Sequence, residues 1–265
     1  MDLNLDGKRA IVTGGSKGIG YAIARGLANE GVDVVIAART SEPLEAAART
    51  LTQETGRRVI AVATDTGDDD QVRALVERTV AELDGVDILV NSAATPWSAG
   101  ASGDLAGTDD ETVRREVEIK VLGYLRTARA VAPYLVEQRW GRIINISGLG
   151  ARQANSIAQT IRNISVSALT KNLADELGPS GVNVTVVHPG LTRTERLTDR
   201  LTVDAEKSGR AIADLEAEIA RNTLRRVIDA SEVADVVTFL ASPRSIAITG
   251  DAVAAGGGVP GPVYY

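Results

Sequence analysis

Short apolar runs rich in β-branched residues recur along the chain, and longer segments with helical periodicity separate them. The runs are RAIVT (9–13), DVVIAA (33–38), VIAVAT (59–64), DILVN (87–91), RIINIS (142–147), VNVTVVH (182–188) and a final short one before GGG near the C-terminus. They are apolar throughout rather than at every second residue, which is typical of strands buried on both faces of a parallel sheet. The pattern predicts a doubly wound (Rossmann) α/β fold of about seven parallel strands with helices on both faces.

One long segment departs from this alternation. Residues 192–230 are polar and rich in Arg and Glu. Since loops past strand ends often carry sites, we expect a helical substrate lid at about 192–230, and the alternative is a pair of solvated surface helices. The length of 265 residues suits one α/β domain, so we expect a single domain over residues 1–265.

Composition narrows the chemistry. The chain has no cysteine, which excludes a disulfide framework, a thiol nucleophile and Cys-based metal sites, and its one histidine cannot form a metal cluster. The net charge of −6 comes from interspersed acidic and basic residues, a pattern without the basic patch that nucleic acid or an anionic membrane would require. The sequence begins MDLNLDGKRA, without signal-peptide character, and no apolar run reaches membrane-spanning length. We expect a cytoplasmic protein that acts on small molecules.

A glycine-rich loop follows the first predicted strand. It reads TGGSKGIG from Thr13 to Gly20, and a helix is expected directly after it. Glycines in this context let the backbone turn tightly and approach a pyrophosphate, which the N–H groups of the helix N-terminus then bind. The residues expected to contact the cofactor here are Gly14, Ser16, Lys17, Gly18, Ile19 and Gly20.

The end of the second strand indicates which dinucleotide binds. A fold that prefers NAD places an acidic residue there for the ribose 2′-hydroxyl, whereas this chain has Ala38 and Arg39. Arg39 and Lys17 together supply two cations for a 2′-phosphate, and no carboxylate is present to repel it. We therefore predict NADP as the cofactor, with NAD less favoured.

These residues, with several later segments, resemble the short-chain dehydrogenase/reductase family over nearly the whole chain. TDT matches the adenine-contacting acid after strand 3, NSAA is a variant of the segment after strand 4, HPGLTRT matches the segment that grips the nicotinamide carboxamide, and ITGDAVAAGGG matches the last strand. The resemblance implies hydride transfer between NAD(P) and a small carbonyl or alcohol in a homo-oligomer, a tetramer or dimer. It adds as cofactor-contacting residues Asp65, Thr66, Asn91, Ala93, Pro189, Gly190, Thr192 and Thr194.

The catalytic positions of the family are filled differently in this chain. Alignment through LTKNLADELGPSGVNVTVVHPG places the family's tyrosine on Gln159 and its lysine on Asn163, both in a predicted helix over 156–178. The serine position falls on Gly148, one residue after Ser147, and the asparagine position falls on Lys120. A spacing of four keeps Gln159 and Asn163 on one helical face, but an amide cannot deliver a proton.

Other groups could take over the lost chemistry. Lys120 could act as an acid, an oxyanion stabiliser or an anchor for an acidic substrate, or its side chain could extend to solvent. Ser147 could bind the substrate oxygen or be an ordinary satisfied polar group, and His188 could transfer protons or be structural. Arg152 and Arg162 could clamp a carboxylate, or cap the loop and face water.

Three functions fit these residues. The first is an atypical NADP(H)-dependent oxidoreductase that transfers a hydride to or from a carbonyl, enone or imine without the tyrosine. The second is a non-redox enzyme, such as a lyase or isomerase, on the same scaffold, and the third is an NADP-binding protein without catalytic activity. The fold does not decide among them, because function depends on the site.

Overall fold

Seven parallel strands form the centre of the protein, whose computed structural model describes residues 1–94, 104–154 and 156–260. Their order in the sheet is β3-β2-β1-β4-β5-β6-β9, so the predicted parallel sheet and its seven strands are confirmed. In the register, Ile11 of β1 lies between Val35 of β2 and Leu89 of β4. The strands are β1 (Arg9–Thr13), β2 (Asp33–Ala38), β3 (Val59–Ala63), β4 (Ile88–Asn91), β5 (Gly141–Ile146), β6 (Val182–Pro189) and β9 (Ala252–Ala255).

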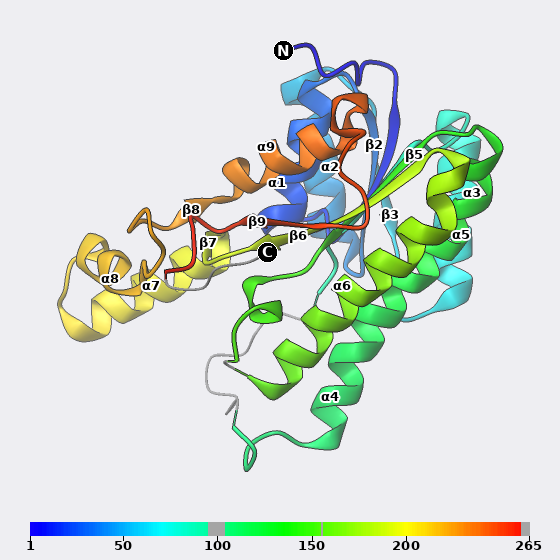
Figure 1. Cartoon of the computed structure of the whole chain (residues 1–265). Helices are drawn as coiled ribbons and strands as arrows, with labels where there is room; N and C mark the ends of the chain where they lie inside the picture. The colour runs from blue at the N-terminus through cyan, green and yellow to red at the C-terminus, as the bar shows by residue number, and fades with distance from the viewer. Residues whose placement is uncertain (95–103, 155, 261–265) are drawn as a thin grey trace.

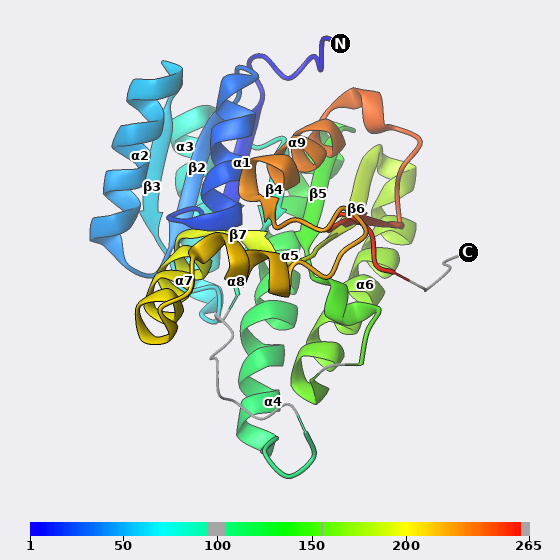
Figure 2. The same cartoon turned by 90° about the vertical axis from the view of Figure 1, so that its left-hand side faces the viewer.

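Helices cover both faces of the sheet (Figures 1 and 2). One face carries α1 (Gly18–Asn29), α2 (Ser41–Thr55) and α9 (Ala230–Ala241). The other carries α3 (Asp69–Leu83), α5 (Gly123–Glu137) and α6 (Ile157–Leu177), the last of which matches the helix predicted over 156–178. Short 3₁₀ turns occur at Leu149–Ala151, Gly178–Ser180 and Pro243–Ser245.

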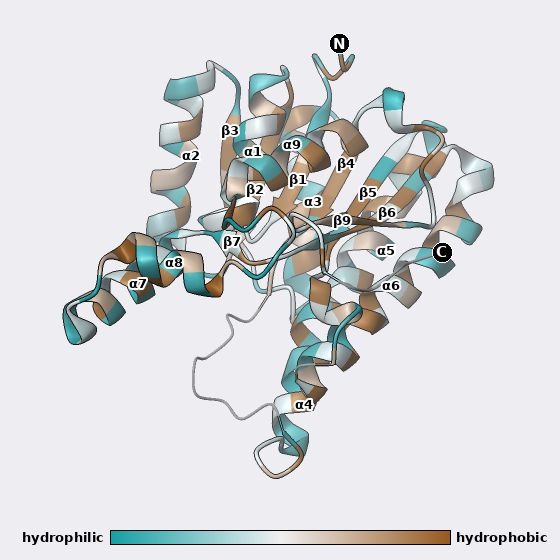
Figure 3. Ribbon diagram, turned by 60° about the vertical axis from the view of Figure 1, so that its left-hand side comes forward, coloured by the Kyte–Doolittle hydropathy of each residue, from teal (hydrophilic) through white to brown (hydrophobic). Residues whose placement is uncertain are grey.

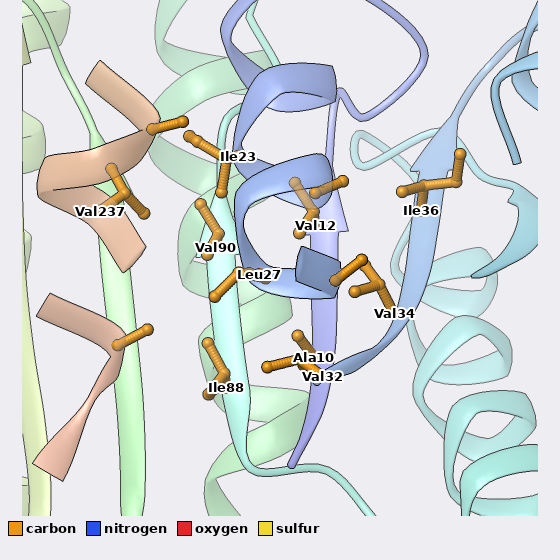
Figure 4. Packing of buried hydrophobic residues seen from close by; sticks show 14 of the residues in the cluster. Ala10, Val12, Ile23, Leu27, Val32, Val34, Ile36, Ile88, Val90 and Val237 are labelled. Carbon is orange, nitrogen blue, oxygen red and sulfur yellow. The ribbon is translucent and has the colours of Figure 1, made fainter. Parts of the chain in front are cut away.

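The inner strands of the sheet are largely apolar because they bury both of their faces, whereas β3 and β9 at the two edges are partly exposed. Val12 belongs with Ile23, Leu27 and Val237 to the cluster beneath α1 and α9 (Figure 4). Ile11, its neighbour in sequence, belongs to the cluster on the opposite face. Figure 3 shows the apolar residues gathered on the sheet strands. Since successive side chains of a strand point to opposite faces, a continuous apolar run is what a doubly covered sheet requires.

Two segments extend from the sheet. The first is α4 (Asp110–Glu116), which continues through a π-helix (Val117–Leu122) into α5. The second lies at residues 192–230, where the sequence breaks the alternation of strands and helices. It contains two helices and a two-stranded parallel sheet, with a small apolar cluster of its own (Figure 1). Its elements are β7 (Thr192–Arg193), α7 (Glu195–Ser208), α8 (Ile212–Ile219) and β8 (Ile228–Asp229). That the segment at 192–230 covers the substrate as a lid stays a prediction.

The order of the strands reverses between β1 and β4, which lie side by side although β2 and β3 separate them in sequence. In doubly wound sheets, ligands bind outside the carboxyl ends of the strands at this point. The glycine-rich loop follows β1, and Ser92 follows β4, so both lie at this end of the sheet. Within the described ranges, no helix combines the length and the apolar character needed to cross a membrane.

Candidate active site

The glycine-rich loop makes a turn that side chains would obstruct. Gly14 and Gly18 have φ values of +69° and +61°, in the left-handed region that favours glycine. A Cβ atom on Gly20 would lie 2.3 Å from the carbonyl oxygen of Gly14, which is far below van der Waals contact. The loop therefore folds back on the first turn of α1 and leaves its backbone open to a ligand.

We expect Gly20→Ala to lower the free energy of unfolding by about 1–3 kcal/mol, because the added methyl group would displace backbone rather than a flexible side chain. Thermal or urea unfolding measures the change. The control is Gly178→Ala at the end of α6, where φ is −55° and no atom lies within 4 Å of the added Cβ. Equal destabilisation by the two substitutions would show that the close packing at Gly20 is not responsible.

An anionic group already occupies the start of α1. The backbone N–H of Gly18 donates to the carboxylate of Glu195, with 3.0 Å between the nitrogen and Oε2. The Cγ2 atom of Thr194 lies 3.3 Å from the position that a Cβ on Gly18 would take. A pocket opens between α1 and the start of α7, and its lining includes Gly18, Tyr21, Ala22, Thr194, Glu195 and Thr198. The helix N-terminus thus accepts an oxyanion in this geometry, as a phosphate site requires.

The two predicted 2′-phosphate ligands are exposed. Lys17 lies in the glycine-rich loop and Arg39 directly after β2. Neither side chain forms a hydrogen bond or ion pair with the part of the chain that the structure describes. Both cations are thus available to an anionic ligand.

Further predicted cofactor residues lie in turns after β3 and β4. Asp65 accepts a hydrogen bond from the backbone N–H of Gly67 at 2.9 Å, and Thr66 is buried against α5. The backbone N–H of Ala93 donates to the Thr13 hydroxyl at 3.2 Å, which holds the turn after β4 beside the end of β1.

Asn91 has its side chain in the interior of the protein. Its amide nitrogen donates to the Asn145 side-chain oxygen at 3.0 Å, and its own oxygen accepts from the Thr127 hydroxyl at 2.7 Å. These bonds fix the end of β4 to β5 and α5. A direct contact of Asn91 with the cofactor stays a prediction.

The segment after β6 lies close to the last strand. A Cβ on Gly190 would come within 2.8 Å of the Cα of Gly256, so only glycine allows the two backbones this approach. The Thr192 hydroxyl donates to the carbonyl oxygen of Gly190 at 3.0 Å, and Thr194 directly precedes α7. Pro189 is the last residue of β6. This chain segment therefore runs from the carboxyl end of β6 to the glycine-rich loop, where Thr194 lies next to Gly18.

A buried lysine is the centre of the candidate catalytic cluster. Lys120 lies on the π-helix, and only 3% of its surface is exposed. Its ammonium group donates to the carbonyl oxygen of Ser147 at 2.9 Å and to the side-chain oxygen of Asn163 at 3.1 Å. The side chain does not extend to solvent, so that alternative is wrong. Isolated π-helical turns often occur at functional sites.

The structure brings three of the four predicted catalytic residues together. The Ser147 hydroxyl donates to the backbone carbonyl oxygen of Asn163 at 3.1 Å and lies 3.3 Å from its side-chain oxygen. Gln159 lies one turn earlier on α6 and is half-buried, and its side chain forms no hydrogen bond within the described ranges. The cluster is therefore Lys120, Ser147 and Asn163, with the amide of Gln159 nearby on the same helix.

Burial controls protonation in this cluster. Desolvation lowers the pKa of Lys120 well below its usual value, the charge of Arg162 lowers it further, and the charge of Glu116 acts in the opposite direction. The pKa of His188 is lowered to about 4, chiefly by burial and then by the charges of Arg152 and Lys120. His188 is thus neutral near pH 7, and its Nδ1 atom is buried without a partner in the described chain.

A buried ion pair beside the cluster was not predicted. Arg162 pairs with Glu116, and the two side chains are 10% and 12% exposed. The sequence suggested that Arg162 either binds a substrate carboxylate or caps the loop and faces water. Neither fits, because its guanidinium group is buried and paired with Glu116. The sequence gives no signal for this contact, because helical spacing predicts neighbours within one helix and not between two. Tyr124 is also buried and donates to the carbonyl oxygen of Ile146 at 2.9 Å.

Known proteins share this architecture. A family model described as enoyl-(acyl carrier protein) reductase matches residues 14–260. The peroxisomal 2,4-dienoyl-CoA reductase of Danio rerio is 35% identical over 94% of this chain and 80% of its own length.

Two solved structures are similar over nearly their full lengths. The L-sorbose reductase of Gluconobacter frateurii, complexed with NADPH and L-sorbose, has a TM-score of 0.93 and 30% identity over 99% of this chain and 100% of its own. An NADPH-bound short chain oxidoreductase of Pseudomonas aeruginosa PAO1 with an atypical catalytic center has a TM-score of 0.87 and 32% identity over 97% and 98% of the two chains. The chain belongs to the short-chain dehydrogenase/reductase family of oxidoreductases.

Proposed function

We propose that this protein is an NADP(H)-dependent oxidoreductase that transfers a hydride to or from a small carbonyl, enone or imine without the tyrosine acid and base typical of its family. The observation that carries this proposal is the position of the Lys120 amine, 3.1 Å from the side-chain oxygen of Asn163. Asn163 occupies the position of the lysine in the family's Tyr-x-x-x-Lys pair. The site thus keeps a cation beside position 163 but supplies it from the π-helix instead of α6.

The chain's own residues fit the predicted cofactor. The glycine-rich loop presents the N-terminus of α1, where a carboxylate already accepts the N–H of Gly18, and the side chains of Arg39 and Lys17 are exposed. Two similar structures hold NADPH. When bound, the nicotinamide ring would supply or accept the hydride.

Lys120 has the donors that a proton-transfer role requires. An ammonium group has three N–H donors, and two are bonded to Ser147 and Asn163, so one remains for a substrate oxygen. In reduction, that N–H bond would break as the O–H bond of the alcohol forms, which leaves a neutral amine that water reprotonates. In oxidation, the neutral amine would take the alcohol proton. Burial lowers the pKa of Lys120 from its usual value, and a general acid and base works best when its pKa lies near the working pH.

The amide of Gln159 has a more limited role. It can orient a substrate oxygen by hydrogen bonding, but it cannot deliver a proton. An iminium ion needs no proton when it accepts a hydride, so such a substrate would react even without Lys120. A comparison of the rates with iminium ions and with ketones therefore shows how much the reaction depends on Lys120.

The test is titration with NADPH and NADP⁺, followed by incubation of the NADPH complex with panels of ketones, conjugated enones and cyclic imines. We expect tight NADPH binding and NADPH oxidation, read at 340 nm, with at least one panel. Failure to bind either nucleotide would overturn the proposal. Binding without oxidation by any acceptor would instead favour a non-redox enzyme or an inactive NADP-binding protein.

A further inference from the structure

A buried ion pair joins the two helices that carry Lys120 and Asn163. Glu116 is the last residue of α4 and directly precedes the π-helix, so Lys120 follows it by four residues. Arg162 lies on α6 immediately before Asn163. The Glu116–Arg162 pair therefore lies within about one helical turn of both members of the Lys120–Asn163 contact.

The pair is unusual in its environment. Its side chains are only 10% and 12% exposed, and the Nε atom of Arg162 is buried without a hydrogen-bond partner in the described chain. A buried ion pair contributes little net stability, because desolvation of the two charges offsets their attraction. Removing one partner, however, leaves an uncompensated charge, and here that charge would lie beside Lys120.

We propose that Glu116 and Arg162 are positioning residues, whose ion pair fixes the π-helix against α6 and so holds the Lys120 amine at Asn163. This inference rests on the proposed function for its catalytic meaning. The pair also balances the charge at the amine. Arg162 opposes a positive charge on Lys120, and Glu116 favours it, so the two effects partly cancel while the pair is intact.

Other charged groups near the amine are few in the described part of the chain. His188 on β6 interacts electrostatically with Lys120, and Arg152 acts on His188 from the loop before α6. The pKa of His188 is about 4, so this side chain is neutral near pH 7. Glu116 and Arg162 are therefore the charges whose removal should move the Lys120 titration.

The experiment follows the lysine directly by NMR of protein labelled with ¹³C at the lysine ε-carbons. The chain has five lysines, and the signal of Lys120 is the one lost in Lys120→Met. We expect Glu116→Gln to lower the Lys120 pKa by about one unit or more, because Arg162 is left unopposed. Arg162→Met should raise it by a similar amount, because Glu116 is then the nearest charge.

The matched control is Glu118→Gln on the same π-helix. Glu118 pairs with Arg126 of α5 at 2.6 Å and is not among the charges that shift the Lys120 pKa. We expect this variant to leave the Lys120 pKa unchanged. Arg162→Lys keeps the positive charge, so we expect its Lys120 pKa to stay close to the wild-type value. This variant still tests the role of the charge if Arg162→Met does not fold. Thermal unfolding verifies that each variant is folded.

Two outcomes would overturn the inference: no movement of the Lys120 titration in either variant, or movement in the same direction in both. A second measurement addresses positioning. With an active substrate, Glu116→Gln should lower kcat by about 10–10²-fold with little change in KM, because the bound substrate meets a misplaced amine. The NMR titration needs no substrate, so a protein that shows the expected pKa shifts but no NADPH oxidation would contradict the proposed function and not the pairing.

Discussion

Lys120→Met is expected to lower kcat/KM for ketone reduction by about 10²–10⁴-fold, the usual contribution of a positioned acid. Methionine has nearly the length of lysine but has no proton to donate. NADPH affinity should stay close to wild type, because Lys120 contacts Ser147 and Asn163 rather than the glycine-rich loop. Relief of the buried charge offsets the two lost hydrogen bonds, so the variant should fold. Steady-state kinetics and NADPH titration on the same preparation measure both quantities.

The pH profile tests the same role independently. Lys120 must be protonated to act as an acid, so the rate of reduction should fall as pH rises through its lowered pKa. The rate of alcohol oxidation should show the opposite dependence, because the neutral amine is then the active form. Lys120→Met should lose both dependences. His188 titrates near pH 4 and cannot produce a change above about pH 5. A wild-type pH profile retained in Lys120→Met would contradict the proposal.

The location of the amine also determines which variant tests the proposed replacement of the family's Tyr-x-x-x-Lys pair. A lysine at position 163 alone would bring a second ammonium group next to Lys120, whose nitrogen is 3.1 Å from the present side-chain oxygen. The consistent variant exchanges the two residues as Lys120→Asn with Asn163→Lys and adds Gln159→Tyr. The family's serine position falls on Gly148, and this position can also accept a serine. Its φ of 172° is extended backbone, and the nearest atom to an added Cβ is 3.4 Å away. This variant should reduce ketones better than Lys120→Met.

The sequence predicted the fold better than the contacts of the site. Strands such as RIINIS carry apolar residues on both faces, and this local pattern predicts a doubly covered parallel sheet. The expected face shared by Gln159 and Asn163 also follows from helical spacing alone. The contact of Lys120 with Asn163 joins residues 43 positions apart on two helices, and no local pattern encodes their distance.

The burial of Arg162 illustrates the same limit. An arginine in a helix is ordinarily exposed, and the sequence neighbours of Arg162 give no reason to expect otherwise. Its partner, Glu116, lies 46 residues earlier. The π-helix that follows Glu116 is likewise absent from the sequence pattern, because a one-turn change in helical geometry leaves the apolar spacing almost unaltered. Tertiary packing decides all three features.

A large effect is also expected on the preference of the protein for NADPH over NADH. Arg39→Ala should weaken NADPH binding by about 10–100-fold, the contribution of a charge-assisted hydrogen bond to phosphate, and leave NADH binding nearly unchanged. Ala38→Asp added to Arg39→Ala should weaken NADPH binding further by repulsion and strengthen NADH binding through the ribose 2′-hydroxyl. The two changes together should reverse the preference between the cofactors, which parallel fluorescence titrations with NADPH and NADH would measure.

The physical reason lies in the surroundings of Arg39. Its side chain is exposed at the end of β2 and has no ion pair within the described ranges, so its charge is free to meet a 2′-phosphate. Arg78→Ala, at an exposed position of α3, removes the same charge elsewhere and should leave the ratio of the two affinities unchanged. If Arg39→Ala and Arg78→Ala weaken NADPH binding equally, the effect is one of net charge, and the cofactor preference must then depend on Lys17 or on the backbone of the loop.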